Sequence, residues 1–181
     1  MPGLLLLVAC SPGAATRSEQ PSDLHGRCDP SLLDMKLIGL GAATGNVRAN
    51  IELRNISSSA CEMYGYASLE LLDAAYRPLP SHISQRTTAF FQHDPAAADV
   101  VVLPIGTAKI VPGRPVQGHA YIPLGFADMG DPCESVVRLR VMPPGASSSV
   151  VIGAADPGGA GYVSICSGGA VTVLPVRATP Y

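Results

Sequence analysis

Apolar and polar residues alternate clearly between residues 47 and 53, where an apolar side chain stands at every second position. This period of two is typical of a β-strand with one buried face. A serine-rich reversal follows at 57–59, and a second apolar segment runs from Cys61 to Leu72. The pattern predicts a strand, a loop and a second strand that opens with a thiol.

Short apolar segments of the same kind recur along the chain, for example at 100–103, 136–142 and 171–174. They are separated by turns, since Gly and Pro contribute 19 and 17 residues, and no helix of real length is indicated. The stretch Ala43–Asn46 contains the Gly-Asn pair of a hairpin turn. Together these features predict an all-β fold, an antiparallel, immunoglobulin-like β-sandwich of about eight or nine short strands.

The N-terminal residues Met1–Cys10 form an apolar run that ends in Leu-Val-Ala-Cys and resembles the lipobox of bacterial lipoproteins. The run is too short to span a membrane. We therefore expect a truncated lipoprotein signal peptide at 1–9, a lipid on Cys10, a flexible tether at 10–26 and one sandwich domain at 27–181. The alternative is a short N-terminal extension with an incidental cysteine.

Four cysteines remain once Cys10 is set aside, and an even number in an exported chain indicates two disulfides. Three connectivities are open, and no Cys-x-x-Cys pair favours a zinc ribbon or a thioredoxin-type site. The four are Cys28, Cys61, Cys133 and Cys166.

Charged residues make up 14% of the chain, and the net charge is −2. Because no basic stripe is present, we do not expect nucleic acid as a partner. The expected partners are the membrane, reached through the N-terminal lipid, and an envelope protein or glycan.

An ordered set of short motifs carries a resemblance that covers about residues 28–176. The set consists of Cys28, Gly45-Asn46, Asn55, Cys61-x-Met-Tyr-Gly65-Tyr66, Val111-Pro-Gly113, Cys133, Val141-Met-Pro-Pro-Gly145, Ile165-Cys166 and Val173-Leu-Pro175. It resembles an actinobacterial family of exported domains, found in mycobacterial and streptomycete lipoproteins and catalogued as a domain of unknown function. The resemblance implies a lipid-anchored or secreted sandwich with Cys28–Cys61 and Cys133–Cys166 bridges, and it implies no activity.

A copper or zinc site would need His, Met or Cys ligands that converge at strand ends. The four histidines, His25, His82, His93 and His119, form no His-x-His motif. The sequence also lacks Gly-x-Ser-x-Gly, Ser-x-x-Lys and His-Glu-x-x-His. We therefore expect no enzyme and no cofactor, and we keep an exported metal carrier or enzyme-like sandwich as the alternative.

Three residues beside the second cysteine have local structural interpretations. Asn55 is expected to be a turn residue whose side chain bonds the nearby backbone. Tyr64 and Tyr66 flank Gly65 and are expected to pack over a disulfide as part of the core.

The segment Ser81–Asp99 shows little periodicity, and long irregular loops in compact domains are often functional. It contains Phe90, Phe91 and His93, which we take as candidate partner contacts. The alternative is that both rings cap an open end of the sandwich. The function expected from the sequence is a non-catalytic binding or accessory module of the cell envelope, on the extracytoplasmic face of the membrane or secreted, with an unknown ligand.

Overall fold

The computed structural model describes residues 26–89, 92–93, 101–103, 118–155 and 161–180. Apart from one 3-10 helix, η1 (Pro30–Leu32), the regular elements of these residues are β-strands. The all-β prediction is therefore confirmed. The described residues contain fourteen strands, more than expected. Two predicted strands are each divided in two, at 61–72 and at 134–142, and three further strands lie between 82 and 93, where none was predicted.

The larger sheet has five strands, ordered β1-β2-β9-β14-β5. Neighbouring strands are antiparallel except β14 and β5, which run parallel. The strands are β1 (Leu33–Ala43), β2 (Asn46–Asn55), β9 (His119–Ala127), β14 (Ala170–Val173) and β5 (His82–Gln85).

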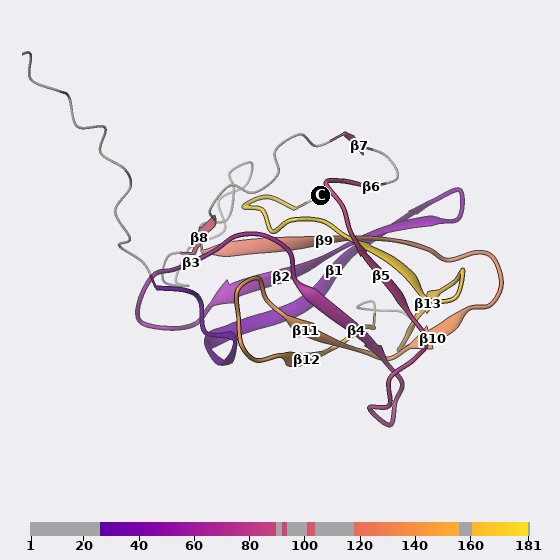
Figure 1. The fold of residues 1–181 in the computed structure, drawn as a ribbon, viewed down its shortest axis with the longest axis horizontal. Helices are drawn as coiled ribbons and strands as arrows, with labels where there is room; N and C mark the ends of the chain where they lie inside the picture. The colour runs from indigo at the N-terminus through magenta and orange to yellow at the C-terminus, as the bar shows by residue number, and fades with distance from the viewer. Residues whose placement is uncertain (1–25, 90–91, 94–100, 104–117, 156–160, 181) are drawn as a thin grey trace, which may run out of the picture.

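A three-stranded sheet, ordered β12-β11-β4, forms the second layer, below β2 and β9 in the view of Figure 1. Three two-stranded ladders complete the fold: β3–β8, β10–β13 and β6–β7. The bounds are β3 (Cys61–Met63), β4 (Ser68–Leu72), β6 (Thr88–Ala89), β7 (Gln92–His93), β8 (Val101–Leu103), β10 (Glu134–Val136), β11 (Arg138–Met142), β12 (Val150–Gly153) and β13 (Val163–Ile165).

The alternation seen in the sequence defines the buried face of β2. Ala49, Ile51 and Leu53 have no exposed surface, and they lie opposite apolar residues of β9 in register. Leu71 of β4 and Val141 of β11 belong to the same buried cluster. The core therefore lies between the two sheets, as expected for a sandwich.

The hairpin between β1 and β2 turns through Thr44 and Gly45, which both have positive φ angles of 51° and 79°. Positive φ at both central residues is the requirement of a type I′ turn. Ala43 pairs with Asn46 across this turn, so the predicted hairpin is confirmed.

The described residues of the segment 81–99, namely 81–89 and 92–93, do not form the irregular loop that the sequence suggested. Its first residues form β5, which pairs with β14 from Ala170↔His82 to Val173↔Gln85. Two further short strands, β6 and β7, pair with each other. This part of the prediction is wrong because a four-residue edge strand gives too short a pattern to recognise.

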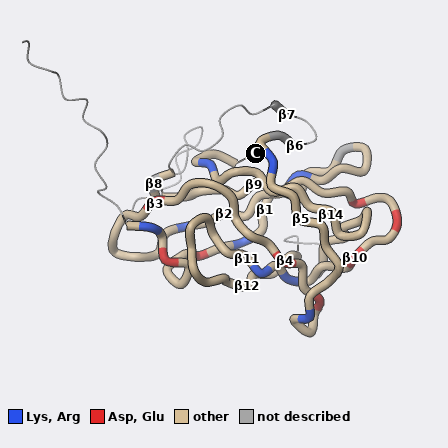
Figure 2. The backbone as a smooth tube through the Cα atoms, viewed as in Figure 1, with Lys and Arg blue, Asp and Glu red and all other residues tan. Residues whose placement is uncertain are grey.

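Both disulfides are present in the pairing that the family resemblance implied. Cys28–Cys61 lies at the β3–β8 end of the sandwich, and Cys133–Cys166 lies at the opposite end, beside β10 and β13 (Figure 1). Charged residues are sparse and scattered along the described chain (Figure 2).

Candidate functional site

A cleft of about 280 Å³ lies at the β3–β8 end of the sandwich. Residues 26–32 form one wall and residues 55–61 form the other. The Cys28–Cys61 disulfide joins the two walls. Backbone hydrogen bonds reinforce this connection, since the Cys28 N–H donates to the Glu62 carbonyl at 3.2 Å and the Glu62 N–H donates to the Gly26 carbonyl at 3.1 Å.

The wall formed by residues 55–61 contains three serines and is called the serine wall below. Its conformation is set by Asn55, which is fully buried. Its side-chain oxygen accepts from the Ser57 N–H at 2.9 Å, and its side-chain nitrogen donates to the Ser59 carbonyl at 2.8 Å. The same nitrogen donates to the Leu103 carbonyl of β8 at 3.1 Å. Asn55 thus fixes the serine reversal to the end of the sandwich, which confirms its predicted role as a turn residue.

The three serines of this wall differ in what their hydroxyl groups do. The Ser57 hydroxyl donates to the Ser59 carbonyl at 2.7 Å, so its proton is used within the loop. Ser58 and Ser59 are exposed, and no described residue is bonded to their hydroxyl groups. They therefore present two hydroxyl groups to the cleft.

The opposite wall begins with Asp29, which caps η1. Its Oδ1 accepts from the Ser31 N–H at 2.9 Å and from the Ser31 hydroxyl at 2.8 Å. These bonds lower the pKa of the exposed Asp29 carboxyl, the backbone bond most strongly. Leu32 and Ile56 remain 44% and 53% exposed, and the Ile56 N–H donates to the Leu32 carbonyl at 2.9 Å. Two apolar side chains therefore lie at neighbouring positions, one on each wall.

Arg27 supplies the positive charge of the cleft. Its guanidinium carbon lies 3.6 Å from the ring centroid of Tyr64. A methyl group added at Gly145 would lie 2.5 Å from Nη1 of Arg27, so the guanidinium also rests on the backbone of the β11–β12 loop. No described residue accepts a hydrogen bond from it or forms an ion pair with it. The Tyr64 ring and the Gly145 backbone therefore hold the guanidinium of Arg27 in place, while its N–H groups stay available to bind a ligand.

Tyr64 was expected in the core and is instead 44% exposed. Met63 is fully buried at the last position of β3, so the alternation of the strand turns Tyr64 outward. The ring serves as the platform for Arg27 rather than as core.

A second group of ionisable residues lies on the outer face of the five-stranded sheet, around Glu52. Its carboxylate pairs with the Lys36 ammonium at 2.9 Å and with Nδ1 of His119 at 2.7 Å, and the Tyr121 hydroxyl lies at 3.5 Å. Burial alone would raise the pKa of Glu52, but hydrogen bonds from Lys36 and His119, and their charges, hold it below its ordinary value. Burial and the charge of Glu52 raise the pKa of Tyr121. The group links β1, β2 and β9.

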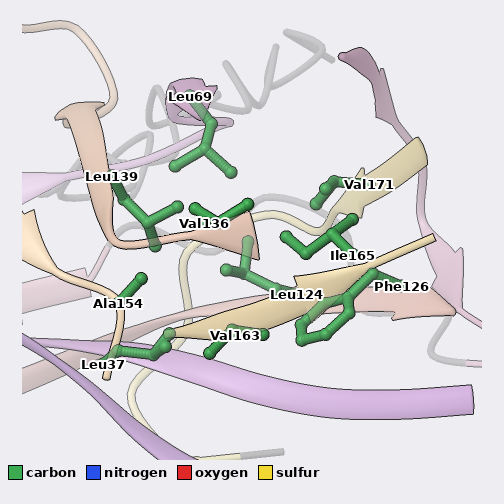
Figure 3. A pocket seen from close by; sticks show the side chains of 10 residues that line it. All are labelled: Leu37, Leu69, Leu124, Phe126, Val136, Leu139, Ala154, Val163, Ile165 and Val171. Atoms are coloured by element: carbon green, nitrogen blue, oxygen red, sulfur yellow. The ribbon is translucent and has the colours of Figure 1, made fainter. Parts of the chain in front are cut away.

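The interior contains a cavity of about 10 Å³ between the sheets, lined by ten apolar side chains that Figure 3 shows pointing inward. Leu37, Leu124, Phe126 and Val171 come from the five-stranded sheet. This volume is near the minimum for one water molecule, and the lining offers no polar partner. The cavity is too small for a ligand.

Among the residues that the structure describes, no three His, Cys, Asp or Glu side chains are grouped so that they could hold a metal ion. No helix in the described ranges is long and apolar enough to cross a membrane.

The candidate residues from the sequence fall into three groups. Cys28, Cys61, Cys133 and Cys166 are paired as described above. Cys10, Phe90 and Phe91 lie outside the described residues, and His93 is placed in β7 by its backbone alone. Sequence reasoning recognised the serine-rich reversal at 57–59 as a turn but not as the wall of a cleft, and it missed Arg27, although the position of Arg27 next to Cys28 was a usable signal.

A family model described as a domain of unknown function (DUF4232) matches residues 28–177. The chain belongs to this family. The DUF4232 match begins at the first cysteine of the cleft and includes both disulfides and the serine wall. No curated protein matches the chain, and no solved structure matches it.

Proposed function

We propose that this DUF4232 domain is an exported binding module without catalytic activity, held at the extracytoplasmic face of a membrane by a lipid on Cys10. The observation that carries the proposal is the cleft of about 280 Å³ at the end where the N-terminal residues join the domain. Gly26, the first described residue, lines this cleft. A ligand bound there would lie close to the membrane.

Two disulfides support the exported location, because such bonds form and persist in oxidising compartments. The volume of the cleft, about 280 Å³, supports binding, because small-ligand sites begin at about 300 Å³. The contacts of His119 give it a structural role in the sheet. Its Nδ1 is bonded to Glu52, whose other oxygen is paired with Lys36, and this arrangement stabilises the sheet.

The proposed lipid anchor and location are tested at Cys10. The full chain, preceded by a complete signal peptide, is expressed in an actinobacterial host and its intact mass is measured. We expect a mature protein that begins at a diacylglycerol-modified Cys10 and sediments with membranes, while Cys10→Ser is released. A mature protein that begins elsewhere, with Cys10 unmodified, would refute the anchor.

Binding is tested by the accessibility of the cleft in its native surroundings. Ser58→Cys in the serine wall is labelled with a maleimide in isolated envelopes and in purified protein, and Ala75→Cys, an exposed site at the far end, is the matched control. We expect Ser58→Cys to react several-fold more slowly in envelopes, and Ala75→Cys to react equally in both. Equal rates for Ser58→Cys would contradict occupancy of the cleft.

Catalysis and metal carriage are tested on the same material. Compounds recovered from the envelope-bound protein should be chemically unchanged after prolonged incubation with fresh protein, and conversion to a product would show an enzyme. Metal analysis of the purified chain should find no stoichiometric copper or zinc. A stoichiometric metal would favour a carrier instead.

A further inference from the structure

The ligand class of the cleft follows from the groups that it leaves without partners, an inference that rests on the proposed binding function. The first is Arg27. One face of its guanidinium covers the Tyr64 ring at 3.6 Å, and the backbone of Gly145 lies against it. A fork of N–H donors held in this way matches the two oxygens of a carboxylate or phosphate.

Arg138 provides an internal comparison, because it is also stacked on a tyrosine, Tyr76, at 4.0 Å. Its Nη1 donates to the Ala74 carbonyl at 2.6 Å and lies 3.4 Å from the Asp73 carbonyl. One guanidinium nitrogen of Arg138, Nη1, is thus bonded within the protein, whereas no guanidinium nitrogen of Arg27 is bonded to a described residue. Of these two described stacks, the one at Arg27 leaves the whole guanidinium fork without a described partner and lies at the cleft, so it is the better placed to receive an external anion.

The other groups of the cleft suit hydroxyl groups rather than charge. Ser58 and Ser59 present hydroxyls that can donate or accept. Oδ1 of Asp29 accepts hydrogen bonds from the N–H and the hydroxyl of Ser31, whereas Oδ2 of the same carboxylate accepts from no described residue. A carboxylate accepts from a hydroxyl but repels a bare anion. The ligand must therefore place its negative charge at Arg27 and hydroxyl groups toward Asp29 and the serines.

We propose that the cleft binds a hydroxylated anion, namely a polyol or sugar that bears a phosphate or carboxylate group. Its volume of about 280 Å³ suits one such unit rather than a folded protein. Two sources share this chemistry: the headgroup of a membrane lipid and a unit of an anionic envelope polymer.

The test uses the purified full chain and calorimetric titration with defined compounds. Glycerol 3-phosphate, inositol 1-phosphate and glucuronate are the probes, and glycerol, inositol and inorganic phosphate are the controls. We expect at least one probe to bind about tenfold more tightly than the polyol without charge and than inorganic phosphate. Equal binding of inorganic phosphate, equal binding of a neutral polyol, or no binding of any probe would overturn the proposal.

Variants assign the binding to the cleft. Arg27→Ala should weaken probe binding about tenfold or more, and Arg27→Lys should restore part of it, because lysine keeps the charge but not the fork. Arg138→Ala, the matched control, should bind as the unchanged protein does. Equal losses in Arg27→Ala and Arg138→Ala would show that the effect is not local and would overturn the assignment.

Asp29→Asn gives a readout that does not depend on the Arg27 variants folding. Asparagine can keep the cap of η1, but it removes the negative charge. We expect the preference for the hydroxylated probe over inorganic phosphate to shrink, because inorganic phosphate is no longer repelled. An unchanged preference would remove Asp29 from the site and overturn the hydroxyl part of the proposal.

The two sources are separated with vesicles and with soluble polymer. Binding to vesicles that contain phosphatidylinositol, competed by inositol 1-phosphate, supports a headgroup. Binding to a soluble glycerol phosphate polymer with no affinity for those vesicles supports an envelope polymer. Failure of every probe, together with slow labelling of Ser58→Cys in envelopes, would refute this ligand class and leave the binding function standing.

Discussion

At the β3–β8 end of the sandwich, a disulfide and an arginine stacked on a tyrosine lie at a cleft. Towards the β10–β13 end there is again a disulfide with an arginine–tyrosine stack nearby, but that arginine donates to carbonyl groups of the protein itself. The two disulfides even join cysteines with the same sequence separation of 33. At the β10–β13 end, Cys166 is fully buried and its N–H donates to the Ala127 carbonyl at 2.8 Å.

The difference between the ends lies in what surrounds the shared parts. Carbonyl groups of the β4–β5 connection accept hydrogen bonds from Nη1 of Arg138. At the other end the neighbouring loops stop short of Arg27 and leave a space of about 280 Å³. The same side chains thus stabilise one end and form a candidate site at the other. A binding site for an anion requires hydrogen-bond donors that the protein itself does not use and enough space beside them for the ligand.

The largest expected loss of stability comes from substituting a glycine at the β10–β13 end. Gly169 has a φ of 75°, and a Cβ there would overlap the Pro80 carbonyl oxygen and lie 3.0 Å from the Ser81 Cα. Backbone atoms cannot move aside cheaply, so Gly169→Ala should lower the free energy of unfolding by about 4 kcal/mol or more in a urea titration. Gly65→Ala at the β3–β8 end is the control, since Gly65 has a φ of 94° but no atom lies within 4 Å of an added Cβ. It should cost only about 1–2 kcal/mol, and equal losses would show that crowding is not the cause.

Removing each disulfide tests the comparison directly. Cys28→Ala/Cys61→Ala and Cys133→Ala/Cys166→Ala each open a loop of the same length, so each should lower the free energy of unfolding by about 3.5–4 kcal/mol in the chain-entropy model. The first pair should also weaken binding of the hydroxylated anion, because it releases the walls of the cleft. Equal loss of binding in the second pair would mean that the two ends are not independent.

Asn55→Ala should have the next largest effect, because it removes three hydrogen bonds from a fully buried side chain. Leaving these backbone groups without partners should cost about 2–3 kcal/mol in thermal or urea unfolding. Arg54→Ala, on the same strand, has an exposed ion pair with Asp34 at 2.8 Å and should cost less than about 1 kcal/mol. A small effect of Asn55→Ala would mean that the serine wall does not depend on it.

Glu52→Gln should have the smallest effect and the clearest pH dependence. Because the pKa of Glu52 is lowered in the folded protein, its ion pairs stabilise the fold above the unfolded pKa. That stabilisation is lost as the pH falls through the folded pKa, so the stability difference between the two proteins, about 1 kcal/mol at pH 7, should begin to shrink near the unfolded pKa of about 4.3 and vanish once the pH is below the lower folded pKa. A difference that persists at lower pH would point to packing rather than charge.

Local patterns predicted the parts of the fold that depend on local chemistry. The alternation in β2 identified its buried face, and the Gly45 turn identified the β1–β2 hairpin. The parallel pairing of β5 with β14 was not predictable, because it joins His82 to Ala170 and β5 has only four residues. The cleft was missed for the same physical reason, since residues 26–32, 55–61 and Gly145 meet only in the folded chain.

β9 gains its two neighbours from opposite parts of the chain, and this has a consequence for biogenesis. On one side it pairs with β2, and on the other with β14 and with Arg177, whose N–H and carbonyl both bond Tyr121. If the chain crosses a membrane with its N-terminus first, Cys28 and Cys61 emerge together, but the sheet stays incomplete until the last residues arrive. A prematurely terminated chain would therefore keep one disulfide and expose an unpaired strand.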